Sequence, residues 1–213
     1  MNKCLITRPD HDKVTSYLFQ WTKNILKINS TNIQFLNLEG KEANRERVES
    51  YLKKQDPRLV LFNGHGSYNL ICGFKNEILI EMGKNDELLK EKIVYALSCS
   101  SARKLGPSAV EKGAEAFIGY KNPFVLYTNS DSEATPLKDD IAASFLNPSN
   151  RVSFSLLKGN TAQEASNKSK EEFKREIRKH SASSSIFGSD MIVAGLLWDM
   201  NSQVVLGKRD ARI

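Results

Sequence analysis

Short strand-like segments that alternate with helix-like segments constrain the fold of this chain most strongly. Five of them, most continuously apolar, lie at 4–7, 33–38, 59–62, 93–97 and 116–119. A continuous apolar run of this length is typical of a strand that is buried on both faces. Strands that alternate with helices form parallel sheets through right-handed crossovers. The pattern therefore predicts an α/β fold, with a mostly parallel sheet of about six strands and helices on both faces.

The remaining segments complete this prediction. We expect helices at 14–26, 42–54, 102–112, 136–145, 161–179 and 190–198, with a helical turn at 86–90. We expect irregular strand or a hairpin at 70–80, a β-prone stretch at 124–127 and a final strand at 204–206. The Pro-Ser-Asn run at 148–150 predicts a loop, and the serine-rich stretch at 181–185 predicts a flexible break.

Length and composition limit the class of protein. The 213 residues, 40% of them hydrophobic, are enough for one domain spanning 1–213 with a substantial core. The three cysteines, at 4, 72 and 99, form no disulfide framework and no C-x-x-C zinc motif. We see neither a signal sequence nor an apolar run long enough for a membrane span, which favours a cytoplasmic protein with no membrane partner. The net charge of +6 lies mainly on 168–180 and 208–212, which predicts a solvated helix and no nucleic-acid partner.

Reactive side chains follow two of the predicted buried strands. His65 comes shortly after 59–62, and Cys99 comes shortly after 93–97. The carboxyl ends of parallel strands meet at one edge of a sheet, and neighbouring strands lie about 4.8 Å apart. This spacing would bring an imidazole close to a thiol.

A thiol beside an imidazole indicates nucleophilic catalysis, because histidine can take the proton of the thiol. The helix predicted directly after Cys99 would lower the thiol pKa further. The backbone N–H groups of Gly66 and Cys99 are candidates for an oxyanion hole. The competing interpretation is that Cys99 is a small packing residue and His65-Gly66 an ordinary turn. Cys4 and Cys72 lack such a setting and are interpreted as packing residues. Nucleotide-binding glycine motifs are absent, so we expect no cofactor, and we expect no metal.

The blocks around these two residues resemble those of the caspase-like cysteine peptidases, which include caspases, metacaspases, gingipains, separase and the CHAT domains. LVLFNGHGS at 59–67 is similar to the His-Gly block, and IVYALSCSSA at 93–102 is similar to the Cys block. GAEAFIGY at 113–120 and the helices expected over 131–146 and 156–173 extend the likeness, which is closest to small prokaryotic CHAT-type peptidases. The sequence departs from caspases in having Ser-Cys-Ser-Ser where they have Ala-Cys-Arg/Gln-Gly.

The resemblance implies a three-layer caspase-like sandwich and a cysteine endopeptidase. By that likeness His65 is the general acid/base and Cys99 the nucleophile, acting as a dyad through an acyl-enzyme. The implied partners are a protein substrate and a separate activator or regulatory protein, in a prokaryotic stress or antiviral defence pathway. The alternative is a catalytically idle caspase-like scaffold that acts as a protein-interaction module.

Acidic residues near the predicted site suggest a substrate preference. Metacaspases have an Asp two residues before the Cys, and Leu97 occupies that position here. Asp10 and Asp12 directly follow the first strand, and Asp131 is a further candidate, so we expect cleavage after Arg or Lys. Asp12 has a competing interpretation as a helix cap, and Arg8 would instead favour acidic substrates. His11 stays open because it lies beside the proposed pocket.

Overall fold

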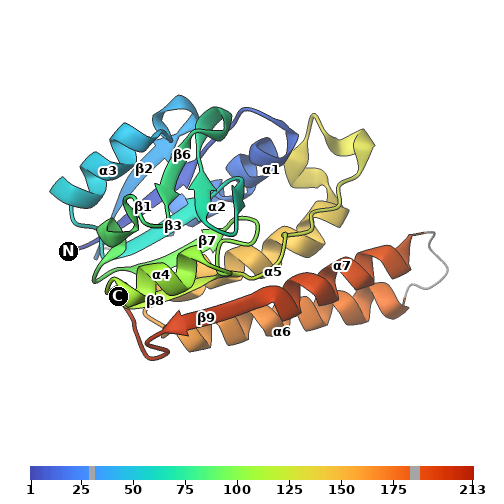
Figure 1. The fold of residues 1–213 in the computed structure, drawn as a ribbon. Coiled ribbons are helices and arrows are strands. Elements are labelled where there is room, and N and C mark those ends of the chain that lie inside the picture. Colours follow the sequence, from blue (N-terminus) through green and yellow to red (C-terminus); the bar gives the residue numbers. More distant parts are fainter. Residues whose placement is uncertain (29–31, 183–187) are drawn as a thin grey trace.

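A mostly parallel sheet forms the centre of the molecule. The computed structural model describes residues 1–28, 32–182 and 188–213 (Figure 1). In this part of the chain six strands pair in the order β2-β1-β3-β7-β8-β9, all parallel except β9, which is antiparallel to β8. Their bounds are β1 (Asn2–Arg8), β2 (Ile33–Glu39), β3 (Leu59–Asn63), β7 (Ile93–Leu97), β8 (Ala116–Tyr120) and β9 (Gln203–Gly207). The prediction of an α/β fold with about six strands is confirmed.

Helices cover both faces of this sheet because successive strand residues point to opposite sides. Along β3, Leu59 and Leu61 join one apolar cluster, whereas Val60 and Phe62 join the other. The first cluster contains residues of α1 (Lys13–Trp21), α2 (Lys23–Leu26), α5 (Asp140–Leu157) and α6 (Ala162–Ala182). The second contains residues of α3 (Arg45–Lys54) and α4 (Leu105–Glu111). The molecule is therefore a three-layer sandwich.

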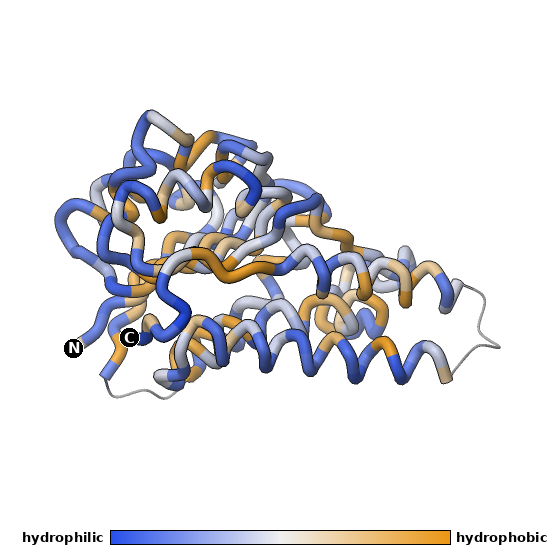
Figure 2. Tube along the Cα trace, turned by 60° about the horizontal axis from the view of Figure 1, so that its bottom comes forward, coloured by the Kyte–Doolittle hydropathy of each residue, from blue (hydrophilic) through white to orange (hydrophobic). Residues whose placement is uncertain are grey.

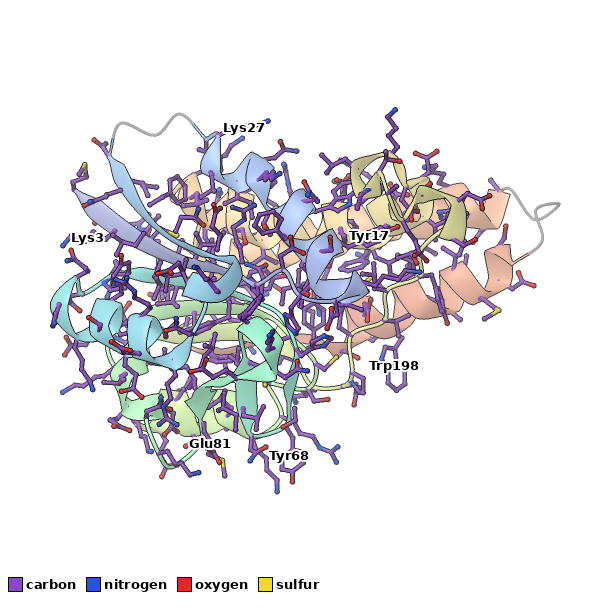
Figure 3. The ribbon with its side chains drawn as sticks, turned by 90° about the horizontal axis from the view of Figure 1, so that it is seen from above. Lys3, Tyr17, Lys27, Tyr68, Glu81 and Trp198 are labelled. Atoms are coloured by element: carbon purple, nitrogen blue, oxygen red, sulfur yellow. The ribbon has the colours of Figure 1, made fainter. Side chains whose placement is uncertain are left out.

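A small antiparallel sheet lies on the α3 and α4 side. It consists of β4 (Gly66–Ser67), β5 (Leu70–Cys72) and β6 (Ile78–Glu81), in agreement with the hairpin expected at 70–80. Tyr68 and Glu81 mark it in Figure 3. Short 3₁₀ segments connect the larger elements: η1 (Gly40–Glu42), η2 (Phe74–Asn76), η3 (Asp86–Leu89), η4 (Ser130–Ser132) and η5 (Pro136–Lys138).

The C-terminal helices form a bundle that extends beyond the sheet. α7 (Ser189–Ser202) lies beside α6, and both reach outward at one end of the molecule (Figure 1). Phe145, Phe173 and Leu196 join α5, α6 and α7 in a separate apolar cluster. Hydrophilic and hydrophobic residues alternate along the α6–α7 pair (Figure 2), as expected for helices with one buried face.

Two predicted elements are wrong, and one predicted helix begins later than expected. Helix α5 continues through 148–150, where a loop was predicted, because Pro148 is buried among packed residues and its carbonyl accepts a hydrogen bond from Ser169 Oγ at 2.8 Å. Residues 124–127 form no strand and run as an irregular segment. Helix α4 begins at Leu105, three residues later than expected. Of the break expected at 181–185, Ser181 and Ala182 end α6, and 183–185 lie outside the described residues.

Candidate active site

His65 and Cys99 follow neighbouring strands; the sequence placed both on one edge of the sheet and left open whether the two strands pair. β3 pairs with β7 in parallel from Leu59–Ile93 to Asn63–Leu97. His65 lies two residues after Asn63, and Cys99 lies two residues after Leu97, the two residues that form the last pair of this ladder. Equal offsets from one register bring both residues to the same edge of the sheet. Both line a single pocket.

Hydrogen bonds join the strand ends that carry the site. Ser98 Oγ donates to the carbonyl of His65 at 3.2 Å and thereby links the turn after β3 to the turn after β7. Asn63 Nδ2 donates to the carbonyl of Thr7 at 2.9 Å, which links β3 to β1. A Cβ atom on Gly66 would lie 2.0 Å from Ser98 Oγ and 2.9 Å from the carbonyl oxygen of Leu70. Only glycine fits there without displacing a neighbour.

Asp12 contacts the imidazole of His65. The His65 Nε2 and Asp12 Oδ2 atoms are 2.7 Å apart. Asp12 also caps α1, because its Oδ1 accepts from the backbone N–H of Thr15 at 2.8 Å and from the Thr15 hydroxyl at 2.9 Å. Partial burial opposes ionisation of this carboxyl, but the hydrogen bonds from Thr15 and His65 prevail and lower its pKa to about 2. An ionised Asp12 selects the tautomer with the proton on Nε2, which leaves Nδ1 to exchange a proton with a thiol.

Sequence reasoning considered Asp12 as part of a substrate pocket or as a cap, and missed its contact with His65. The structure confirms that Asp12 caps α1. The position of Asp12 in the sequence could have revealed this contact. Asp12 follows β1 and His65 follows β3, and these two strands pair in parallel. The residue is therefore a partner of the imidazole rather than a free carboxylate.

The pocket beside Cys99 is largely apolar. Its volume is about 200 Å³, and its lining residues are Val14, Leu18, Gly64, His65, Leu97, Ser98, Cys99, Phe124 and Leu126. No carboxylate is among these described lining residues. Asp10 and Asp131 are exposed and do not line the pocket. The geometry does not place the expected acidic floor beneath a substrate Arg or Lys.

Cys99 is held as a protonated thiol. Its Sγ lies 3.9 Å from the carbonyl oxygen of Phe124 as a donor. Burial raises its pKa, although the contact with the Phe124 backbone lowers it, and Asp199 raises it further when ionised. The expectation of a thiol pKa lowered by a helix is wrong, because a turn separates Cys99 from the start of α4. Ser100 in that turn has a φ of 55°, a left-handed conformation that is costly for serine.

Asp199 of α7 is a buried carboxyl that sequence reasoning missed. Its side chain is 0% exposed, and its Oδ1 accepts from the backbone N–H of Val125 at 2.9 Å. Its Oδ2 has no partner among the described residues. Burial raises the pKa of Asp199 to about 8 despite the Val125 hydrogen bond. A lone carboxyl inside the apolar run LLWDM was the available signal. It anchors the segment whose Phe124 and Leu126 line the pocket.

Two backbone groups remain candidates for an oxyanion hole. The Cys99 N–H has no partner within the described chain. The Cys72 N–H donates to the carbonyl of His65, so Gly66 occupies a non-hydrogen-bonded position of the β4–β5 ladder and its N–H points away from β5.

The other two cysteines are buried. Burial raises the pKa of the thiols of Cys4 and Cys72, as expected for packing residues.

One group of side chains has the donor types of a metal site, although the sequence predicted none. His11, Asp12 and His65 each offer a ligand atom, and these atoms lie within 4.8 Å of one another. The group shares His65 with the candidate dyad.

No protein-family model matches the chain, and no curated protein matches it significantly. None of the helices in the described ranges has the length and apolar character needed to cross a membrane.

Proposed function

We propose that this protein is a cysteine endopeptidase of the caspase-like type, with Cys99 as nucleophile and His65 as general acid/base. The observation that supports it best is the placement of both residues at equal offsets beyond two paired parallel strands, in one pocket. The three-layer sandwich agrees with the resemblance of the His and Cys blocks to that family. We also propose a cytoplasmic location, with stress or antiviral defence as the setting that the likeness to prokaryotic CHAT peptidases suggests.

The proposed reaction is acyl transfer. Cys99 Sγ transfers its proton to His65 Nδ1 and forms a bond to the substrate carbonyl carbon. The N–H groups of Cys99 and Gly66 stabilise the oxyanion, and the imidazolium gives its proton to the leaving amine. Water, deprotonated by the same imidazole, then hydrolyses the thioester and releases Cys99. Asp12 is a positioning residue, because it holds the Nε2 side of the ring.

The thiol geometry is that of a resting enzyme. Cys99 donates toward the Phe124 carbonyl, and in the described structure no hydrogen bond joins its sulfur to His65. Asp199 fixes this segment through Val125, and Trp198 Nε1 fixes it through the carbonyl of Pro123 at 2.8 Å. We propose that the segment exchanges between this arrangement and a second one in which the thiol contacts the imidazole, so that alkylation of the resting protein already depends on His65. A separate activator or the substrate itself favours the second arrangement.

We propose that the pocket binds the side chain of the substrate residue that precedes the cleaved bond. Val14, Phe124 and Leu126 favour an apolar side chain over the Arg or Lys that the sequence predicted. A panel of fluorogenic peptides that differ only at this position decides between them. Faster cleavage after Leu or Met than after Arg supports the apolar preference, and the reverse order supports an acidic contact outside the pocket.

Alkylation by iodoacetamide tests the dyad directly. Cys4 and Cys72 are buried, so faster labelling of Cys99 alone does not identify an active thiol. The deciding quantity is the labelling rate of Cys99 in the His65→Ala variant relative to wild type, with His180→Ala as the matched control. We expect His65→Ala to lower the rate by about 100-fold, the lower end of the range for a general base. Equal rates in all three proteins would contradict the proposal.

The second candidate function is an idle scaffold for protein interaction. The raised thiol pKa and the absence of a Cys99–His65 hydrogen bond in the described structure favour it. An idle scaffold predicts no cleavage of any peptide under any activating condition, together with a Cys99 labelling rate that does not depend on His65.

A further inference from the structure

The β1–α1 turn and the turn after β3 bring two imidazoles onto one carboxylate. Asp12 Oδ2 lies 2.7 Å from His65 Nε2 and 3.4 Å from His11 Nε2. The two histidine rings meet edge to face with their centroids 6.0 Å apart. Only the His65–Asp12 contact is part of the proposed peptidase mechanism, so the position of His11 needs a separate explanation.

His11 contributes a buried nitrogen without a hydrogen bond. Its side chain is 8% exposed, and Nε2 has no hydrogen-bond partner among the described residues. The ring is held from the other side, because Nδ1 lies 3.5 Å from the Thr15 hydroxyl and the ring packs edge to face against Phe74 at 5.6 Å. The Nε2 atom lies 3.4 Å from Asp12 Oδ2, without hydrogen-bond geometry. Leaving a buried polar atom without a hydrogen bond costs about 1–3 kcal/mol, so its retention points to a ligand. The fixed ring directs Nε2 toward Asp12.

The donor set matches zinc. Two imidazole nitrogens and one carboxylate oxygen are ligands of catalytic-type zinc sites, which keep a further position open. Zinc bonds of about 2.0–2.1 Å place tetrahedral donors about 3.3 Å apart. The His11–Asp12 separation already fits, and the His65–Asp12 pair needs to widen by about 0.6 Å once an ion replaces the shared proton.

The surroundings also suit an ion. Thr15 occupies the other oxygen of Asp12, so Oδ2 remains as the ligand and its direction is fixed. The side chains of Asp12 and His65 are 38% and 35% exposed, which gives an ion access from solvent. Cys99 is not needed to complete this donor set.

We propose that His11, Asp12 and His65 form a zinc-binding site, and that zinc bound there inhibits the peptidase. The inhibitory part rests on the proposed function: an imidazole bound to zinc through Nε2 cannot become the imidazolium that protonates the leaving amine. The metal-binding part is independent of any peptidase activity. Zinc is therefore a reversible inhibitor that binds the general base, His65, and does not bind the thiol of Cys99.

Metal binding is measured first on Cys99→Ser, which has no thiol nucleophile. The chelator-stripped protein is titrated with zinc against a chromophoric chelator. We expect one equivalent per chain in wild type and in Cys99→Ser, an unchanged affinity in the His180→Ala control, and an affinity at least about 10-fold weaker in His11→Ala. Because His11→Ala removes a buried ring, His11→Gln is a second variant. Zinc at a fixed concentration should raise the melting temperature of wild type by more than that of either His11 variant.

Cobalt in place of zinc identifies the ligands. The proposed site gives a cobalt spectrum without a thiolate charge-transfer band. Such a band, a loss of affinity in Cys99→Ser, or equal affinity in wild type and both His11 variants would overturn the site.

The inhibition is then read as the ratio of peptide cleavage with and without zinc. We expect zinc to slow wild type and to have little effect on His11→Ala. If zinc binds to an active enzyme without slowing cleavage, the proposed inhibition is wrong and the proposed zinc site stands. If no condition gives cleavage, the proposed function fails, while the binding titration still decides the metal site.

Discussion

Asp199→Asn should stabilise the protein in a pH-dependent way. The carboxyl is 0% exposed and keeps its proton to about pH 8, against an ordinary pKa of 3.8. Asparagine is neutral and nearly the same shape, and its carbonyl oxygen can still accept from Val125 N–H. The substitution therefore removes the ionisable carboxyl of Asp199 and keeps the hydrogen bond from Val125 N–H.

The sign follows from which state holds the proton. In the unfolded chain Asp199 ionises near pH 3.8, whereas in the folded protein it stays neutral until about pH 8. Folded protein then binds more protons between these values, so wild-type stability falls as pH rises through them, by at most about 1.4 kcal/mol per pH unit. The full span amounts to about 6 kcal/mol, which is comparable with the total stability of many domains.

Urea denaturation of wild type and Asp199→Asn at pH 5, 6, 7, 8 and 9 measures this effect. The difference in free energy of unfolding should favour the variant increasingly up to about pH 8 and then level off. Asp190→Asn, an exposed position on the same helix, is the control and should give a difference that does not change with pH. A constant difference for Asp199→Asn would refute the assignment of a neutral buried carboxyl.

Three further substitutions test the site. Asp12→Ala removes the cap of α1 and the His65 partner, so it should cost about 1 kcal/mol in denaturation and slow the His65-dependent alkylation of Cys99; unchanged alkylation would contradict the positioning role. Gly66→Ala forces a Cβ against Ser98 Oγ and the Leu70 carbonyl, so unfolding should become about 1–3 kcal/mol easier, and a variant as stable as wild type would contradict the close approach. Leu126→Asp places a carboxylate in the pocket and should shift the fluorogenic panel toward Arg; an unchanged order would show that this pocket does not select the substrate.

Local pattern was enough to predict the elements that carry the dyad. The runs at 59–62 and 93–97 are buried on both faces, so their strands and the shared edge of His65 and Cys99 follow from periodicity and sheet geometry. The pairing of the two strands and its register came only from the structure. The failures have a tertiary origin. Pro148 reads as a loop residue in isolation, but burial keeps it inside α5. The contacts of Asp12 and Asp199 depend on how α1 and α7 pack against strand ends far away in sequence, which no local pattern specifies.

If Cys99 acts as the nucleophile of a peptidase, the active protein creates new termini in other proteins. Wild type, Cys99→Ala and the His180→Ala control are each incubated with lysate of the cells that produce the protein, and new N-termini are identified by mass spectrometry. We expect wild type and His180→Ala to produce a shared set of new termini that is absent for Cys99→Ala. Identical sets for wild type and Cys99→Ala would contradict it.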